Sequence, residues 1–436
     1  MGKRILVIGI TDIGRRACAA FADAGAEITH LASPTDSELK ELFLEPYDGV
    51  AVMLHNDIEA LRYSMTIAHL NPGMPFLVAI FDRSVRHELE RTIPNCITAS
   101  PAFIAEASVI ASLFVDCDAI RRVGPAENPS WEILEVADQQ VSTSNYKPSL
   151  KTWITQLFAY GSGQLRAYDF ASKALLSGLL SLTVILITDT LIIHRNLPLV
   201  ESFYSAAAVI AGVTAPEQPH TQLQFIQSGI YMLLTIIFVA MFGAGVVNHI
   251  LHGRRVGIVG RRVIPRRNHV VVVGLGQVGI RLCKELKLLK IPVVAIEQNE
   301  NSRGILFARD MNVPVIVGNA SDMRTLRRVN LSGAKALFAM TSSEDENVAI
   351  AVAARTKYPQ THISLRAGTN DAIEETQSLF AIGKVVDVNG LTASYAAQAL
   401  LHQAPKVVFA DGSALTIVTR DNQVISQPMA GRCSCS

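Results

Sequence analysis

The sequence predicts a mixed architecture: two doubly wound α/β domains flanking a membrane α-helical unit. Two observations predict this fold class. An apolar strand, a glycine-containing turn and a helical pattern follow one another twice, once near each end of the chain. Between these copies lie two long apolar runs with almost no charge. The chain of 436 residues, 49% of them hydrophobic, is also too long for one ordinary domain.

The two apolar runs are long enough to cross a bilayer as helices. The first, 174–193, has Asp189 as its only charged residue, and the second, 225–250, has none. A helix of about twenty residues rises roughly 30 Å, which matches the hydrocarbon core of a membrane. We therefore expect a membrane unit over 170–252. The alternative is a pair of buried core helices in a soluble protein.

Basic residues around the two runs indicate their orientation, because Lys and Arg collect on the cytoplasmic side of short connections. Arg166 and Lys173 precede the first run, and six arginines between 254 and 267 follow the second. The connection 194–224 contains Arg195 as its single Lys or Arg. We therefore expect a multi-pass protein of the cell membrane with both termini in the cytoplasm. The near balance of 39 Lys and Arg against 38 Asp and Glu argues against a nucleic-acid partner.

The second α/β domain, expected over 268–405, begins with a nucleotide-binding pattern. After the strand-like HVVVV come Gly274, Gly276 and Gly279 in G-x-G-x-x-G spacing, and Glu297 ends the next strand-like run. Such glycines let the backbone approach a pyrophosphate at a helix N-terminus, and the acidic residue accepts hydrogen bonds from a ribose. The structural alternative is a doubly wound domain with an empty crevice.

Polar residues after the later strands of this domain belong to the same predicted crevice, because ligands of such sheets bind beyond the carboxyl ends of the strands. Asn319 and Thr341 could equally be turn or cap residues. The predicted cofactor-binding residues are Gly274, Gly276, Gln277, Val278, Gly279, Glu297, Asn319, Ala320, Thr341 and Ser342. The expected cofactor is NAD or another adenine nucleotide (NADH, ATP or ADP).

The first α/β domain, expected over 1–117, repeats this order in a weaker form. Its turn is G-x-T-x-x-G, with Gly9, Thr11 and Gly14, and the second strand ends without an acidic residue. Later segments still resemble the second copy, as in DGVAVMLHND against AKALFAMTSSED. We interpret the domain as a duplicated copy that kept its shape and lost most of its nucleotide chemistry.

The segment between the apolar runs completes a known pattern. It reads ESFYSAAAVIAGVTAPE over 201–217, an acidic and aromatic start, a small apolar helical body and a break at Pro216. Together with two membrane runs and two Rossmann-type domains, this resembles ligand-gated potassium channels with RCK domains (regulators of potassium conductance). The resemblance implies a re-entrant pore loop over 201–217. It implies these pore residues: Gly212, Val213, Thr214, Ala215, Pro216 and Glu217.

The pore loop departs from the potassium filter TVGYG. Pro216 replaces the second filter glycine and Ala215 replaces the tyrosine. Because proline fixes φ near −65°, a standard potassium filter is not expected. A wider pore selecting cations through a ring of Glu217 side chains is one possibility, and a loop that only packs the bundle is the other.

Two segments remain beside these domains. Residues 118–169 are rich in Pro, Ser and Asn and are expected to form a linker with a possible interfacial helix. Residues 406–436 are expected to form a short β segment and a tail.

The resemblance implies a homotetramer in the lipid bilayer with a cytoplasmic RCK ring, in which nucleotide binding gates the passage of an inorganic cation. We expect no enzymatic activity, because the sequence contains no G-x-S-x-G motif and no cluster of Cys, His and Asp. Two alternatives stay open: a nonconducting nucleotide-sensing membrane regulator, and an NAD(P)-dependent redox enzyme.

Overall fold

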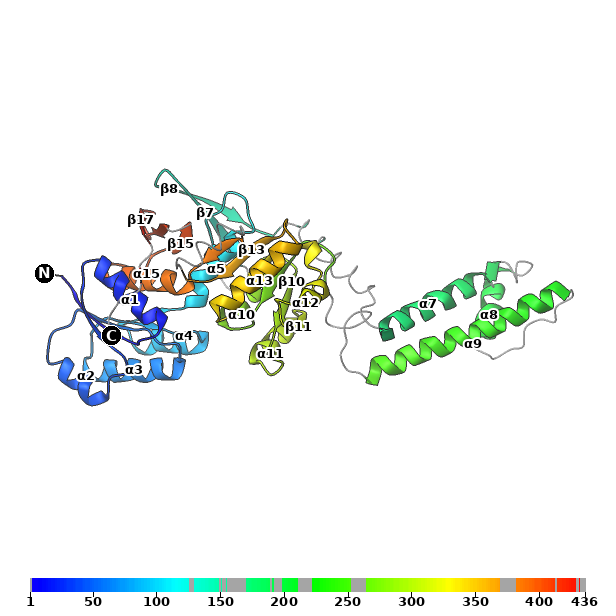
Figure 1. Ribbon diagram of the computed structural model, residues 1–436, viewed down its shortest axis with the longest axis horizontal. Coiled ribbons are helices and arrows are strands. Elements are labelled where there is room, and N and C mark those ends of the chain that lie inside the picture. Colours follow the sequence, from blue (N-terminus) through cyan, green and yellow to red (C-terminus); the bar gives the residue numbers. More distant parts are fainter. Residues whose placement is uncertain are drawn as a thin grey trace. The chain divides into compact units, whose positions relative to one another are not determined.

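The structure is a computed structural model of the whole chain. It describes residues 2–124, 129–148, 150, 154, 170–188, 190–191, 198–210, 222–251, 264–368, 382–411, 414–428 and 431. The chain forms two compact units (Figure 1). The first comprises 1–159 and 265–436, and the second comprises 160–264.

The first half of the larger unit is built on a parallel sheet. Its strands are β1 (Arg4–Ile8), β2 (Glu27–Leu31), β3 (Gly49–Val52), β4 (Phe76–Ala79) and β5 (Cys96–Ala99), in the order β2-β1-β3-β4-β5. Its helices are α1 (Asp12–Asp23), α2 (Asp36–Leu42), α3 (Asp57–Leu70), α4 (Arg83–Thr92) and α5 (Pro101–Ala111). Strands β3 and β4 are buried along their whole length, as expected for a sheet covered on both faces.

The second half repeats this order and adds one edge strand. Its strands are β9 (His269–Val273), β10 (Val293–Glu297), β11 (Val315–Val317), β12 (Ala334–Ala339), β13 (His362–Arg366) and β14 (Lys384–Val386), ordered β11-β10-β9-β12-β13-β14 and all parallel. Its helices are α10 (Gln277–Leu288), α11 (Arg303–Asp310), α12 (Met323–Arg328), α13 (Glu344–Lys357) and α15 (Val388–Leu401), with a short 3₁₀ helix at Leu331–Gly333. This is the doubly wound order of dinucleotide-binding folds. The parallel, Rossmann-like sheets predicted from the sequence are confirmed.

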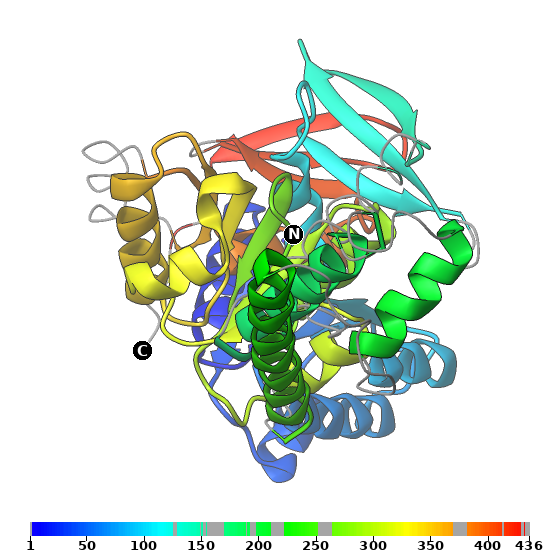
Figure 2. The ribbon, with the colours of Figure 1, turned by 90° about the vertical axis from the view of Figure 1, so that its right-hand side faces the viewer.

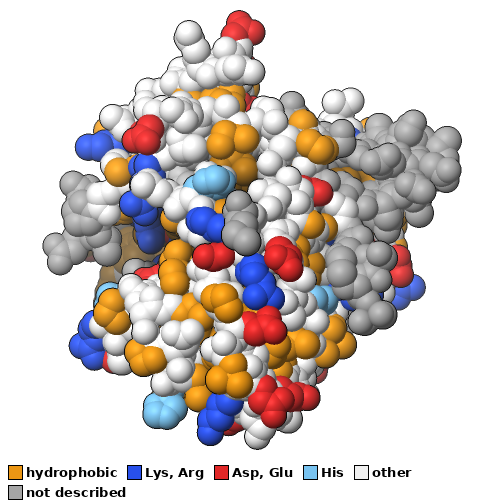
Figure 3. Space-filling model, turned by 90° about the vertical axis from the view of Figure 1, so that its left-hand side faces the viewer, with side chains coloured by type: hydrophobic (Ala, Val, Ile, Leu, Met, Phe, Trp, Pro, Cys, Tyr) orange, Lys and Arg blue, Asp and Glu red, His pale blue; other side chains and the backbone are white. Residues whose placement is uncertain are grey.

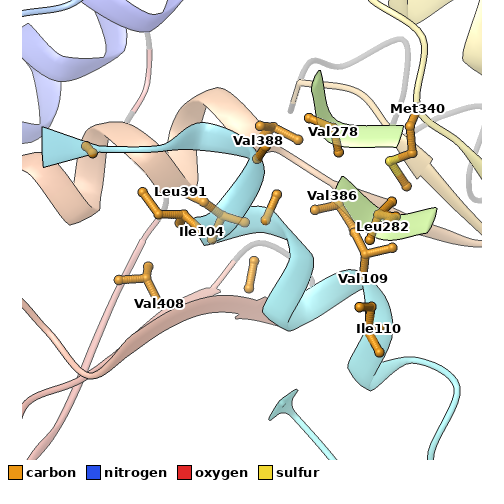
Figure 4. Packing of buried hydrophobic residues seen from close by; sticks show 14 of the residues in the cluster. Ile104, Val109, Ile110, Val278, Leu282, Met340, Val386, Val388, Leu391 and Val408 are labelled. Carbon is orange, nitrogen blue, oxygen red and sulfur yellow. The ribbon is translucent and has the colours of Figure 1, made fainter. Parts of the chain in front are cut away.

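The two halves exchange their last helices. Helix α5 leaves the first sheet and packs on α10 and β14, while α15 packs on α1 and on strands β3 to β5. Figure 4 shows side chains from α5, α10, β14 and α15 meeting in one core, where Val109, Leu282 and Val386 lie close together. Nearly every residue of α5 and most of α15 are buried, because each helix lies between the two halves. The larger unit therefore has a shared core.

Each exchanged helix is held at its end by a lysine from the other half. The Lys335 ammonium on β12 donates to the carbonyl oxygen of Leu113, just beyond α5, at 2.6 Å. Lys3, just before β1, donates in the same way to Leu401 at the end of α15, at 2.5 Å. A cation at a helix C-terminus is favoured because the last carbonyl groups have no partner within the helix.

A buried ionic cluster also joins α5 to α10. The Arg281 guanidinium on α10 binds both carboxylate oxygens of Glu106 on α5, one at 2.9 Å. Glu285, 2% exposed, accepts a hydrogen bond from Arg122 on β6 (Ala119–Val123) at 3.0 Å and lies 3.6 Å from Arg281. Burial raises the pKa of Glu106 to about 7, although Arg281 acts in the opposite direction.

This cluster predicts a pH-dependent stability. The pKa of Glu106 in the folded chain, about 7, lies above its ordinary value of 4.5, so the folded state binds the additional proton. The stabilisation is complete below the ordinary pKa and is lost as the pH rises through the folded pKa. Glu106→Gln should flatten the decline of unfolding free energy between about pH 5 and pH 8, measured by urea denaturation at each pH. An equally steep decline in the variant would contradict the assignment.

Two small antiparallel sheets follow the exchanged helices. Strands β6 (Ala119–Val123), β7 (Ser130–Ala137) and β8 (Gln140–Tyr146) come after α5, and β15 (Val407–Asp411), β16 (Ala414–Val418) and β17 (Val424–Pro428) come after α15. They share a small core that includes Leu134 and Phe409, and the cyan and red strands lie together in Figures 1 and 2. The duplication therefore extends beyond the Rossmann sheets.

The strands β6 to β8 correct the interpretation of 118–169 as a linker. Over 119–146 the chain is a folded sheet and not a spacer. Its β7–β8 turn places Asp138 and Gln139 at φ of 50° and 62°, a conformation usually marked by Asn-Gly or Asp-Gly. Without the glycine, the hairpin has no strong sequence signal. The suggested interfacial helix at 152–170 falls almost wholly outside the described residues.

The smaller unit consists of helices. Helices α7 (Phe170–Thr188) and α9 (Gln222–Leu251) cover most of the two apolar runs and lie side by side, and α8 (Leu199–Ile210) lies between them in sequence. Many of their apolar side chains are exposed, including Leu180, Leu233 and Ile236. Among the described residues, no helix combines the length and apolar character needed to cross a bilayer. Gly212 to Glu217, the predicted pore residues, lie outside the described residues.

The close approach of α7 and α9 depends on a glycine in α7. A methyl group at Gly178 would lie 3.0 Å from the backbone nitrogen of Phe242 in α9. Gly243, on the same helix as Phe242, has open space where its side chain would be. Close packing of the pair therefore uses the small residue at position 178.

Candidate functional site

The glycine-rich loop after β9 has the geometry of a phosphate-binding turn. Gly274 has φ of +84°, and a methyl group there would lie 3.0 Å from the Thr341 backbone. A side chain at Gly279 would overlap the carbonyl oxygen of Gly274, so strand end and helix start are in direct contact. Both positions therefore require glycine, one for its backbone angle and one for close packing.

Gly276 differs from its two neighbours because nothing in the protein fills the space beside it. It is the N-cap of α10, and a methyl group there would meet no atom within 4 Å. The amide groups of Gln277 and Val278 follow in the first helical turn, where N–H groups have no partner within the helix. The bare backbone and the helix N-terminus together form an open cradle suited to an anionic group.

Glu297 lies at the end of β10, beside this cradle. Its Oε2 accepts a hydrogen bond from the Leu275 amide at 2.8 Å, and its Oε1 accepts one from the Asn299 amide at 3.1 Å. These bonds fix the carboxylate against the glycine-rich loop. A carboxylate has about four acceptor sites, so two remain for the hydroxyl groups of a ligand.

The cradle opens into a cavity of about 1290 Å³ between the two halves of the larger unit. The second half contributes most of the wall, including the glycine loop, Glu297 and the ends of β12 and β13. The first half contributes Asp12, His55, Asn56, Asp57 and Phe81. A ligand in the crevice would therefore touch both halves.

The structure brings most of the predicted site residues to this cavity. Those lining it are Gly274, Gly276, Gln277, Val278, Glu297, Ala320, Thr341 and Ser342. Gly279 lies beneath the loop as a packing residue. Asn319 is not part of the wall: its Oδ1 accepts from the amide and the hydroxyl of Ser321, both at 2.8 Å, so it is the turn residue that the sequence left as an alternative. Thr341 also shapes its own loop, through a hydrogen bond from its hydroxyl to the Ser343 carbonyl at 3.1 Å.

Sequence reasoning missed the part of the wall that comes from the first half. The internal repeat contains a signal for it, since DGVAVMLHND aligned with AKALFAMTSSED places His55 opposite Ser342. In the same way Asp12 occupies the position of Gln277. The repeat alone does not reveal that the two crevices face each other, because that depends on the exchange of α5 and α15.

In the glycine-loop region of the first half, two polar side chains are hydrogen-bonded to the backbone. The Thr11 hydroxyl, at the position of Gly276, donates to the Met53 carbonyl at 3.2 Å. His30, near the position of Glu297, has its Nε2 2.8 Å from the Gly9 carbonyl oxygen. Thr11 thus places a side chain where the second half has open space beside Gly276.

A charged network joins the halves at the edge of the cavity. Arg16 on α1 is 1% exposed and contacts Asp387, the N-cap of α15, at 2.5 Å and Asp12 at 3.1 Å. Asn389 donates to Asp12 at 2.8 Å. Arg366 lies in the field of Glu344, Asp387 and Asp12, and burial lowers its pKa. Burial and the nearby Arg366 also lower the pKa of His55, which favours the neutral imidazole.

Comparison with known protein families agrees with this geometry. Residues 270–387 match the model of the TrkA-N domain family. The TrkA-N segment covers the glycine loop, Glu297 and strands β9 to β14, and it ends at Asp387. The first half and the helical unit lie outside the match.

Two curated relatives and one solved structure extend the comparison. The chain is 27% identical to Potassium channel protein 1 of Methanocaldococcus jannaschii over 172 residues, 38% of this chain and 52% of that protein. It is 32% identical to the putative cation/proton antiporter YbaL of Escherichia coli over 106 residues, 24% of this chain and 19% of YbaL. The crystal structure of the GsuK RCK domain superposes with a TM-score of 0.50 at 12% identity, covering 99% of this chain and 90% of that chain.

These comparisons establish a TrkA-N domain over 270–387, a similarity in sequence to a potassium channel protein over 172 residues, and the Rossmann-like fold of the GsuK RCK domain. Its matches span about half of the archaeal channel protein and about a fifth of YbaL. Among the described residues, no group of three or more His, Cys, Asp or Glu side chains is placed to hold a metal ion.

Proposed function

We propose that the protein is a membrane-anchored, ligand-gated cation channel-like protein whose TrkA-N segment binds an adenine nucleotide. The observation that carries the proposal is the open cradle at Gly276, between the N-terminus of α10 and the fixed carboxylate of Glu297. NAD, NADH, ATP and ADP all carry phosphates for the cradle and a ribose for Glu297. In the first half, Thr11 carries a side chain at the position of Gly276, so we assign one nucleotide to each chain.

Different residues of the site bind the phosphates and the ribose. The amides of Gln277 and Val278 bind phosphate oxygens, and the bare Gly276 backbone admits the pyrophosphate. Glu297 accepts hydrogen bonds from ribose hydroxyls while the loop amides hold it in place. Because first-half residues line the same cavity, occupancy changes the relative stability of arrangements of the two halves. The change equals the difference in the ligand's affinity for those arrangements.

The smaller unit supplies the membrane part of the proposal. Its support is the sequence of 174–193 and 225–250 and the exposure of apolar side chains along α7 and α9. We place these helices in the cell membrane with both termini in the cytoplasm, in a homotetramer whose nucleotide-binding units form a ring. The segment 212–217, with Pro216 in place of a filter glycine, lines a cation pathway without a standard potassium filter. The protein acts without catalysing a reaction.

The nucleotide site is tested by Gly276→Asp. A carboxylate in the cradle would repel phosphate and occupy its space, so nucleotide-induced stabilisation should disappear. In the unchanged protein, nucleotide at one hundred times its dissociation constant should add about 2.7 kcal/mol to the unfolding free energy. The measurement is thermal denaturation of detergent-purified protein with and without NAD or ADP. Asn301→Asp, which adds the same charge at an exposed site outside the cavity wall, is the control and should respond normally.

Ion flux into liposomes tests the channel part separately. Purified protein should pass a monovalent cation, and adenine nucleotide should change the rate in the unchanged protein and not in Gly276→Asp. Nucleotide binding without flux of any cation would leave a nonconducting sensor. Unchanged nucleotide stabilisation in Gly276→Asp would move the ligand to another site.

A further inference from the structure

The cavity is larger than the cradle requires. Its volume of about 1290 Å³ exceeds the roughly 300–1,000 Å³ of ordinary small-molecule sites. Its wall runs from Gly276 past the ends of β12 and β13 to residues of the first half. A ligand whose phosphates occupy the cradle thus has room for a second group between the halves.

The wall of this cavity is predominantly acidic. Arg366 is the single Lys or Arg among its described residues. Its carboxylates belong to Asp12, Asp57, Glu297, Glu344 and Glu346. The helix N-terminus at α10 offsets this charge near the cradle, and its effect is confined to about the first turn. The N-termini of α1 and α13 offset part of the charge of Asp12, Glu344 and Glu346 in the same way. With five carboxylates against Arg366, the summed formal charge of the described wall remains negative.

Asp12 is the wall residue of the first half that is bound by side chains of both halves. Its Oδ2 accepts from Arg16 at 3.1 Å and from Asn389 at 2.8 Å, and its side chain is 27% exposed. In the surrounding network the carboxylates of Asp12, Glu344 and Asp387 face the guanidinium groups of Arg16 and Arg366. Three negative charges against two positive ones leave one negative charge in excess.

We propose that Asp12, with Glu344 across the cavity wall, is a specificity-determining residue that selects a dinucleotide with a neutral or cationic distal group and rejects nucleotides ending in free phosphates. The inference rests on the proposed nucleotide site and adds its selectivity. A dinucleotide has its phosphates in the middle, where the cradle neutralises them. The third phosphate of ATP would extend beyond the reach of α10, toward the carboxylates. The positively charged nicotinamide of NAD⁺ would instead be attracted to them.

The wall therefore predicts an order of affinities. NAD⁺ binds more tightly than NADH, since the two differ by the ring charge, and both bind more tightly than ATP. We expect a preference for NAD⁺ over ATP of about tenfold or more at physiological salt.

The test compares NAD⁺, NADH and ATP, without metal ions, by isothermal titration of the detergent-purified full chain and of Asp12→Asn. The amide keeps the shape and can still accept from Arg16 and Asn389, while one negative charge is lost. The preference for NAD⁺ over ATP should fall by about fivefold, mainly through tighter ATP binding. Asp23→Asn removes the same charge from the exposed end of the same helix and should leave the preference unchanged. Glu344→Gln repeats the test if the first variant does not fold.

The outcomes separate the inference from the proposed function. Tighter ATP binding in Asp12→Asn or Glu344→Gln, with an unchanged control, supports the inference. Binding of all three ligands with the same preference in every variant overturns it and leaves the nucleotide site standing. If the full chain binds none of the three nucleotides, both the proposed nucleotide site and its selectivity are overturned. The same follows if Gly276→Asp and its control Asn301→Asp lose the binding of every nucleotide equally.

Discussion

Arg16→Met is expected to lower the unfolding free energy by about 3–5 kcal/mol, because it leaves a buried carboxylate without its cation. Arg16 is 1% exposed and Asp387 is 3% exposed. Without Arg16, the carboxylate of Asp387 keeps the Gly390 amide, which donates at 2.9 Å. Burial already raises the pKa of Asp387 while Arg16 lowers it. The loss is measured by urea denaturation near neutral pH.

Two further variants make this prediction specific. Arg16→Met combined with Asp387→Asn removes both charges and should recover a large part of the lost stability. Arg62→Met breaks the exposed pair with Asp36, at 3.2 Å, and should cost less than about 1 kcal/mol. If Arg16→Met were as mild as Arg62→Met, the ion pair would not be what joins α1 to α15.

Gly279→Ala is the second change with a large expected effect. The added methyl group would overlap the Gly274 carbonyl oxygen. The carbonyl oxygen belongs to the backbone and the methyl group is attached directly to it, so a change of rotamer cannot relieve the clash. The cost should reach about 3 kcal/mol, at the upper end for overpacking, and nucleotide binding should be lost with the loop geometry. Urea denaturation and calorimetric titration measure the two effects.

Gly276→Ala is the matched control for this variant. Its methyl group would meet no protein atom within 4 Å, so folding should change by no more than about 0.5 kcal/mol. Binding should still weaken, because the methyl group would enter the space assigned to the phosphates. Equal stability of the two variants would show that the loop does not pack as described.

The strands and helices of the two Rossmann halves were predictable because their signals are local. The run HVVVV needs only its own residues to indicate a buried strand, and the glycines at 274, 276 and 279 define a turn through their spacing. The hairpin β7–β8 was not predictable in this way. Its strands mix polar and apolar residues, and its turn uses Asp138 and Gln139 where a glycine is usual.

The same limit applies to single residues of the site. Glu297 was found because its distance from the glycine loop along the chain is characteristic of the fold. Asp12 and Asp387 are 375 positions apart, and both form ion pairs with Arg16. The sequence around each residue gives no indication of this contact. Residue type alone could not show that Asn319 is a turn residue and not part of the cavity wall. It also could not show that Gly178 is the glycine that lets α7 and α9 approach each other.

The sequence by itself determined the duplicated α/β pattern and the glycine-rich cradle of the second copy. It also determined that Thr11 stands at the position of Gly276 in the first copy. Each of these features depends on residues within a few positions of one another. The tertiary structure alone decided that α5 and α15 change places and that the first half forms a wall of the second half's cavity. Those features arise from the burial of apolar side chains on helices and strands that are far apart in the sequence. Because the hydrophobic effect is non-directional, an apolar face in the sequence does not indicate which other face will cover it.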